Sequence, residues 1–213
     1  MDGTLYEKRK EKMADLASRK LAHRYLKEKG ILQKMPRSDI KRMDKNMEHG
    51  SVTMSLRYLS EKYSIDLNEV ETFAYNIYPR AFGIVRNEQL IRLLTDLSKR
   101  YKLAIFTNGY DIWVERTLKA LGISSLIKKG MIVSPMHLKK YLKPEQGAFR
   151  IMLKRTGFKK SEVVFLDDKM QNIAKARKMG IKSILVKNKG RNKRNSIHSI
   201  LRRIAYDVKW QII

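Results

Sequence analysis

The N-terminal part of the chain carries its hydrophobic side chains at helical spacing. Four such patterns follow one another: residues 8–29, a short segment after residue 36, residues 52–63, and a segment from Asp66 to Pro79. Spacings of three and four residues place these side chains on one face of a helix. Gly30 and Pro79 are typical of helix ends, and Asp66 is typical of a helix start. The pattern therefore predicts an all-helical segment.

From about residue 90 the pattern changes, and short apolar runs alternate with helical patterns. The apolar runs are residues 103–106, 131–133, 163–166 and 183–186, and the helical patterns are residues 90–100, 112–121, 145–156 and 172–179. Such alternation predicts right-handed βαβ units and a parallel sheet with helices on both faces. A final amphipathic segment at residues 197–204 is expected to pack on this core. The fold class is therefore α/β.

Composition adds constraints on where the protein works and what it binds. The chain has 213 residues, no Cys and a hydrophobic fraction of 43%. It has no apolar run long enough to span a membrane, so we expect a cytoplasmic protein without disulfides. The net charge of +26 attracts polyanions and phosphorylated substrates. We interpret the basic stretch at residues 187–194 as a solvated loop, with nucleic-acid binding as the alternative.

Polar residues follow two of the predicted strands, where ligands bind in open α/β sheets. Thr107 and Asn108 come after the first strand, Asp167 and Asp168 come at the end of another, and Lys143 lies between them in a loop. A hydroxyl and a lysine suit the oxygens of a phosphoryl group, and adjacent carboxylates suit Mg²⁺. Singly, each motif is most often a turn or a helix cap. Together, in this order, they predict phosphoryl transfer.

The chain begins with Asp2-Gly3-Thr4-Leu5-Tyr6, which resembles motif I of the haloacid dehalogenase (HAD) superfamily, Asp-x-Asp-Gly-Thr-Leu-Tyr. Three other segments are similar to motifs II, III and IV of that family: residues 105–109, 142–144 and 164–168. The resemblance implies a Rossmann-like core of residues 1–6 and 81–213, with a helical cap at residues 7–80 inserted after motif I.

The resemblance also implies roles for single residues. Asp2 is expected to be the acid/base, and its backbone carbonyl is expected to meet the metal. Thr107 and Asn108 are expected to bind phosphate together with Lys143, and Lys143 is also expected to act in catalysis. Asp167 and Asp168 are expected to hold Mg²⁺ together with Asp2. These are the roles that the family's motifs assign to the matching positions.

One branch of the family matches best, and it suggests a substrate. Residues 106–109 and 167–172 are most similar to the pyrimidine 5′-nucleotidase branch. That branch often has a His a few residues after its Thr-Asn-Gly, where this chain has Trp113. Both Trp113 and Trp210 are expected to be packing residues. The four His residues show no metal-ligand spacing, and we assign them no chemistry.

The nucleophile of motif I would stand one residue before Met1, at the end of a strand. In the family's sheet, that strand lies between the strands that match residues 103–106 and 163–166. Three explanations are open: a start codon misassigned downstream, a relative that has lost catalysis, or Asp2 as a displaced nucleophile. A two-residue shift along a strand moves a carboxylate by about 6–7 Å, which is too far for attack. The favoured explanation is the misassigned start.

We therefore expect a Mg²⁺-dependent phosphomonoester hydrolase that forms an aspartyl-phosphate on a nucleotide or another small phosphate. The alternative is a catalytically inactive relative that binds RNA or another polyanion. A phosphomutase or a dehalogenase would share the same residues, and metal dependence would separate the dehalogenase. The sequence predicts neither the substrate nor the oligomeric state.

Overall fold

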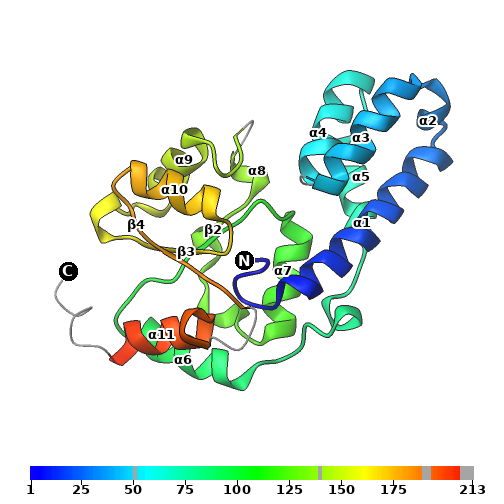
Figure 1. Ribbon diagram of the computed structural model, residues 1–213. Coiled ribbons are helices and arrows are strands. Elements are labelled where there is room, and N and C mark those ends of the chain that lie inside the picture. Colours follow the sequence, from blue (N-terminus) through cyan, green and yellow to red (C-terminus); the bar gives the residue numbers. More distant parts are fainter. Residues whose placement is uncertain (50–51, 139–140, 189–192, 207–213) are drawn as a thin grey trace.

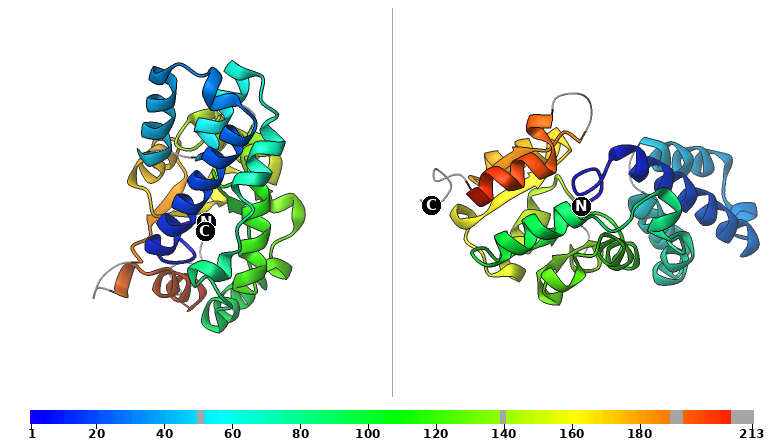
Figure 2. Two further views of the ribbon diagram at one scale, coloured as in Figure 1. Left: turned by 90° about the vertical axis from the view of Figure 1, so that its right-hand side faces the viewer. Right: turned by 90° about the horizontal axis from the view of Figure 1, so that it is seen from below.

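The computed structural model describes residues 1–49, 52–138, 141–188 and 193–206. The described chain forms a helical lobe and an α/β lobe (Figure 1). The right-hand view of Figure 2 shows the helical lobe to one side of the α/β lobe, with the N-terminus at the junction. No helix among the described residues is long and apolar enough to cross a membrane. Trp210 and residues 189–192 of the basic stretch lie outside the described residues.

The helical lobe consists of five helices that pack on one another. They are α1 (Lys8–Glu28), α2 (Ile31–Lys34), α3 (Arg37–His49), α4 (Val52–Tyr63) and α5 (Leu67–Ala74). Asp66 caps α5, since its side chain accepts hydrogen bonds from the backbone N–H groups of Asn68 and Glu69 at 2.8 and 3.1 Å. The prediction of an all-helical segment is confirmed, and the structure adds the short helix α2, which the pattern did not predict.

The prediction that Pro79 ends the last of these helices is wrong. α5 ends at Ala74, and Pro79 instead begins the short 3₁₀ helix η1 (Pro79–Phe82). The segment between α5 and η1 leads back to the α/β lobe. Arg116 holds this segment, because its guanidinium donates to the carbonyls of Tyr75 and Ile77 at 3.1 and 3.0 Å.

The α/β lobe alternates strands and helices as predicted. The strands are β1 (Ile105–Phe106), β2 (Ile132–Val133), β3 (Val164–Asp167) and β4 (Lys182–Leu185). The helices are α6 (Glu88–Ser98), α7 (Asp111–Leu121), α8 (Pro135–Leu138), α9 (Gln146–Thr156), α10 (Met170–Lys178) and α11 (Ile197–Tyr206). Four 3₁₀ turns complete this lobe: η2 (Ser124–Leu126), η3 (Lys129–Met131), η4 (Lys160–Glu162) and η5 (Lys193–Asn195). The amphipathic segment that was expected to pack on the core is α11, which lies against α6.

The expectation of one continuous sheet needs correction. The described strands form two separate parallel pairs, β1 with β2 and β3 with β4. A cavity of about 530 Å³ is lined by residues of both β1 and β3. Val164 of β3 also lines it and is 37% exposed. The two pairs of described strands are therefore not hydrogen-bonded to each other, although the rings of Phe106 and Phe165 lie 5.9 Å apart.

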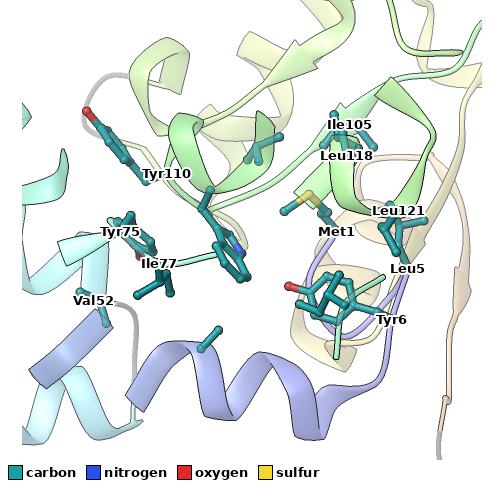
Figure 3. Packing of buried hydrophobic residues seen from close by; sticks show 14 of the residues in the cluster. Met1, Leu5, Tyr6, Val52, Tyr75, Ile77, Ile105, Tyr110, Leu118 and Leu121 are labelled. Carbon is teal, nitrogen blue, oxygen red and sulfur yellow. The ribbon is translucent and has the colours of Figure 1, made fainter. Parts of the chain in front are cut away.

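The chain's first residues are buried at the junction of the two lobes. Met1 belongs to the same hydrophobic cluster as Ile105, Leu118 and Leu121 of the α/β lobe (Figure 3). It also lines the cavity between β1 and β3. The backbone carbonyl of Met1 accepts a hydrogen bond from the N–H of Leu5 at 2.8 Å, which closes the segment into a turn. This turn places Asp2 next to the strand ends.

Candidate functional site

All six site residues predicted from the sequence line one cavity of about 170 Å³. They are Asp2, Thr107, Asn108, Lys143, Asp167 and Asp168. They come from four separate stretches of the chain, which meet because the carboxyl ends of β1 and β3 point to the same side. The cavity lies between the two lobes, since Glu11, Asp15, Val52 and Tyr75 of the helical lobe complete its wall.

Asp2 is held by two hydrogen bonds from aromatic side chains. The indole N–H of Trp113 donates to its Oδ1 at 3.0 Å, and the Tyr6 hydroxyl donates to the same oxygen. Burial and the neighbouring Asp2 charge raise the pKa of Tyr6 well above its ordinary value, so the phenol keeps its proton. Trp113 is buried, as expected of a packing residue, but it also orients Asp2. Its position in α7 gave no signal of this second role.

Lys143 and Asp167 form a buried ion pair at the base of the cavity. The Lys143 ammonium donates to Oδ2 of Asp167 at 2.7 Å and to the carbonyl of Phe106 at 2.9 Å. The other carboxylate oxygen of Asp167 accepts from the backbone N–H of Lys169 and from Asn172, at 2.8 and 2.9 Å. Burial is the largest single effect and opposes ionisation of Asp167, but the neighbouring positive charges, Lys143 foremost, and the hydrogen bonds from Lys143 and Lys169 together outweigh it and hold the pKa of this carboxyl below its ordinary value.

Asn108 positions Lys143 through its backbone. The Asn108 side-chain amide donates to the carbonyl of Lys143 at 3.0 Å, and its oxygen accepts from the Lys143 N–H at 3.0 Å. Thr107 is tied to β2 by its own N–H, which donates to the Val133 carbonyl at 2.9 Å, and its hydroxyl accepts from the Gly109 N–H at 2.9 Å. The end of β1 is therefore held in place by contacts within the protein itself.

Asp168 lies against the turn at the N-terminus. Its two oxygens accept long hydrogen bonds from the Thr4 hydroxyl and from the Lys8 ammonium, both at 3.4 Å. Gly3 sits between Asp168 and the helical lobe with φ +67°, and a Cβ there would lie 2.5 Å from Oδ2 of Asp168 and 2.8 Å from Oε2 of Glu11. Only glycine fits this position, because both its conformation and its contacts exclude a side chain.

The carboxylates of this cavity have the chemistry that Mg²⁺ requires. Mg²⁺ binds through one or two carboxylates and keeps several waters. Asp167 and Asp168 are adjacent in the cavity wall, which Asp2 also lines, so these carboxylates are the groups that could hold the ion. No three acidic or His residues within the described part of the chain already converge on one point. Binding would therefore rely on two carboxylates and water.

Sequence reasoning missed the residues that the helical lobe contributes to the site. Glu11 and Asp15 stand four residues apart in α1, and both line the cavity, as does Tyr75. Burial, together with the charge of Asp2, raises the pKa of Glu11 to about 7 and that of Asp15 to about 6. Their four-residue spacing directly after the Asp2 motif was the available signal, because it places both side chains on one helix face.

The fold gathers the polar residues of the site at the ends of parallel strands, next to a helical lobe. A family model described as haloacid dehalogenase-like hydrolase matches residues 1–186. The chain belongs to this family of hydrolases.

Proposed function

We propose that the protein is a Mg²⁺-dependent phosphomonoester hydrolase that acts on a small phosphate ester through an aspartyl-phosphate. The observation that carries the proposal is the meeting of Thr107, Lys143, Asp2 and the pair Asp167–Asp168 around one cavity. Nucleotides of the pyrimidine 5′-nucleotidase type are the first substrate class to test. Residues 7–80 act as a cap that closes over the site, and residues 1–6 with 81–213 form the core.

The residues of the cavity divide the reaction between them. A carboxylate nucleophile attacks phosphorus, and the ester oxygen leaves with a proton from the carboxyl group of Asp2. Asp2 then takes a proton from water, which attacks the phosphoryl group and releases phosphate and the nucleophile. Thr107 and Lys143 bind the phosphate oxygens, and Trp113 keeps Asp2 oriented through its 3.0 Å hydrogen bond. A bound Mg²⁺ supplies charge neutralisation at the phosphate, with Asp167 and Asp168 to hold it.

The nucleophile in this proposal belongs to a strand that occupies the space between β1 and β3. Residues of β1 and β3 both border the cavity of about 530 Å³, and an apolar strand placed there would pair with the backbone groups at these edges.

The test is a pair of proteins extended before Met1 by about five apolar residues, a length typical of strands. One version ends in Asp directly before Met1, and the matched control ends in Asn. We expect both to be more stable than the chain of 213 residues. Only the Asp version should hydrolyse p-nitrophenyl phosphate or nucleoside monophosphates in Mg²⁺. A folded Asp version that hydrolyses no phosphate ester would refute the proposal.

Binding of a polyanion is the second candidate function, and the net charge of +26 favours it. It predicts retention on RNA or heparin that weakens steeply with salt. The candidate is rejected when the protein elutes no later than an unrelated protein of equal charge. Charge reversal at Lys193 and Arg194 tests the basic stretch at residues 187–194.

A further inference from the structure

The charged side chains that line the cavity between the two lobes are mainly acidic, although the chain as a whole is strongly basic. The whole chain has 47 basic and 21 acidic residues. The wall of this cavity, in contrast, contains five carboxylates, from Asp2, Glu11, Asp15, Asp167 and Asp168, against the two ammonium groups of Lys143 and Lys169. The proposed hydrolysis uses three of these carboxylates. Glu11 and Asp15 are left without a part in it.

One carboxylate oxygen of Glu11 receives no hydrogen bond from the described part of the protein. Its side chain is only 11% exposed, and its Oε2 is buried without a hydrogen-bond partner among the described residues. Its other oxygen lies 3.9 Å from the Lys169 ammonium, which is a weak contact. A buried carboxylate oxygen without a donor is costly, so a donor from a bound ligand would stabilise it. The same α1 face presents Asp15 one turn further along.

Aromatic rings line the same cavity as these carboxylates. Tyr75 is buried in the cavity wall, fixed by a 3.1 Å hydrogen bond to Thr53 and by stacking on Tyr110 with ring centroids 5.7 Å apart. Trp113 lines the cavity from the α/β lobe. Carboxylates attract an ammonium ion by charge, and aromatic faces attract it through the ring quadrupole. The side of the cavity formed by the helical lobe therefore suits a cation.

Size restricts the ligand as well. The cavity holds about 170 Å³, whereas pockets for drug-sized ligands hold about 300–1,000 Å³. Oε2 of Glu11 and Oδ2 of Asp168 also lie within a few ångströms of each other, because both approach the same point beside Gly3. A ligand that reaches both the phosphate-binding residues and Glu11 is consequently short.

We infer that Glu11 and Asp15 select a phosphate monoester whose leaving group is a short alcohol bearing a protonated amine. This inference rests on the proposed function, because it assumes that phosphate binds at Thr107 and Lys143. The ammonium of the substrate donates to Glu11 and Asp15 and lies near Tyr75. The phosphate occupies the opposite end of the cavity.

Binding measurements on the chain of 213 residues test the inference without requiring turnover. The probes are O-phosphoethanolamine, its uncharged isostere 2-hydroxyethyl phosphate, inorganic phosphate and uridine monophosphate, each titrated calorimetrically in Mg²⁺. We expect O-phosphoethanolamine to bind roughly 10-fold more tightly than the isostere, as charge-assisted hydrogen bonds are stronger than neutral ones. This ratio should fall to about one in Glu11→Gln and Asp15→Asn, and it should persist in the matched control Glu7→Gln, an exposed position just before α1.

The outcomes separate the inference from the proposed function. Binding of inorganic phosphate without a preference for the amine overturns the inference alone. A preference that survives in both Glu11→Gln and Asp15→Asn overturns it too, as does tighter binding of uridine monophosphate. If a folded protein binds none of the four probes, the proposed function fails and the inference fails with it. Circular dichroism of each variant confirms that it is folded.

Discussion

Replacement of Lys143 by Met tests the electrostatics of the site through stability alone. Lys143 is 8% exposed and Asp167 is 3% exposed, and the ammonium lies 2.7 Å from the carboxylate. The ammonium also lies 5.0 Å from the centre of the Phe106 ring and 5.4 Å from that of Phe165. Met has a similar length and suits these rings, so Lys143→Met removes the charge with little change in packing.

The expected cost follows from leaving a buried carboxylate without its partner. Breaking a buried ion pair typically costs about 3–5 kcal/mol, a large share of a total stability of about 5–15 kcal/mol. For a chain of this size the loss corresponds to a decrease in Tm of about 6–20 °C. The double variant Lys143→Met with Asp167→Asn leaves no buried charge and should recover most of the loss.

The pH dependence supplies an independent check. Because the folded state lowers the pKa of Asp167, the ion pair stabilises the protein above the unfolded pKa of about 3.9 and loses this effect as the pH falls through the folded value. The difference between wild type and Lys143→Met should therefore be largest near neutral pH and shrink at acid pH. Urea unfolding followed by circular dichroism measures it. A loss below about 1 kcal/mol at pH 7, or a double variant as unstable as the single one, would refute the reasoning.

Two further predictions concern burial and backbone conformation. Burial raises the pKa of Glu71 to about 8, although the charge of Arg57 acts in the opposite direction. Between about pH 4.5 and pH 8, Glu71 therefore keeps its proton in the folded protein and loses it in the unfolded chain. The stability of the protein should consequently fall as the pH rises through this range. In Glu71→Gln this decline in stability should be smaller by on the order of 3 kcal/mol. Urea unfolding midpoints of wild type and variant at pH 5 and pH 9 measure it. The same decline in both proteins would contradict the prediction. Gly3→Ala should lower Tm and weaken binding of inorganic phosphate, because its Cβ would lie 2.5 Å from an Asp168 oxygen. Gly30→Ala is the matched control, because Gly30 has the same φ of +67° and a Cβ there would have no neighbouring atom within 4 Å. An equal decrease in Tm in both variants would show that only backbone strain acts.

Local patterns in the sequence determined most of the helices and strands. The pattern over residues 52–63 coincides with α4, and the Asp66 signal marks the start of α5. The glycines after α7 and α9, Gly122 and Gly157, have positive φ as helix-ending residues should. These features depend on side chains and backbone within a few residues of one another, which is why the sequence alone predicted them.

The sequence also predicted that the site residues lie together: Thr107, Lys143 and Asp167 from their positions near strand ends, and Asp2 from the resemblance of residues 2–6 to motif I. Asp2, Thr107, Lys143 and Asp167 all line one cavity, as that reasoning requires. Their hydrogen bonds were not predictable, and neither was the second role of Trp113. An indole that reaches Asp2 from α7 depends on how α7 packs against the first turn of the chain.

Only the tertiary structure decided how the two lobes meet. It placed Glu11, Asp15 and Tyr75 in the wall of the cavity, and it separated the strands into two pairs around a space of about 530 Å³. Sequence periodicity shows which face of a helix is polar, but it does not show which other element that face approaches. The contacts that define this site join residues far apart in the chain, such as Asp2 and Trp113, and such contacts exist only once the whole chain has folded.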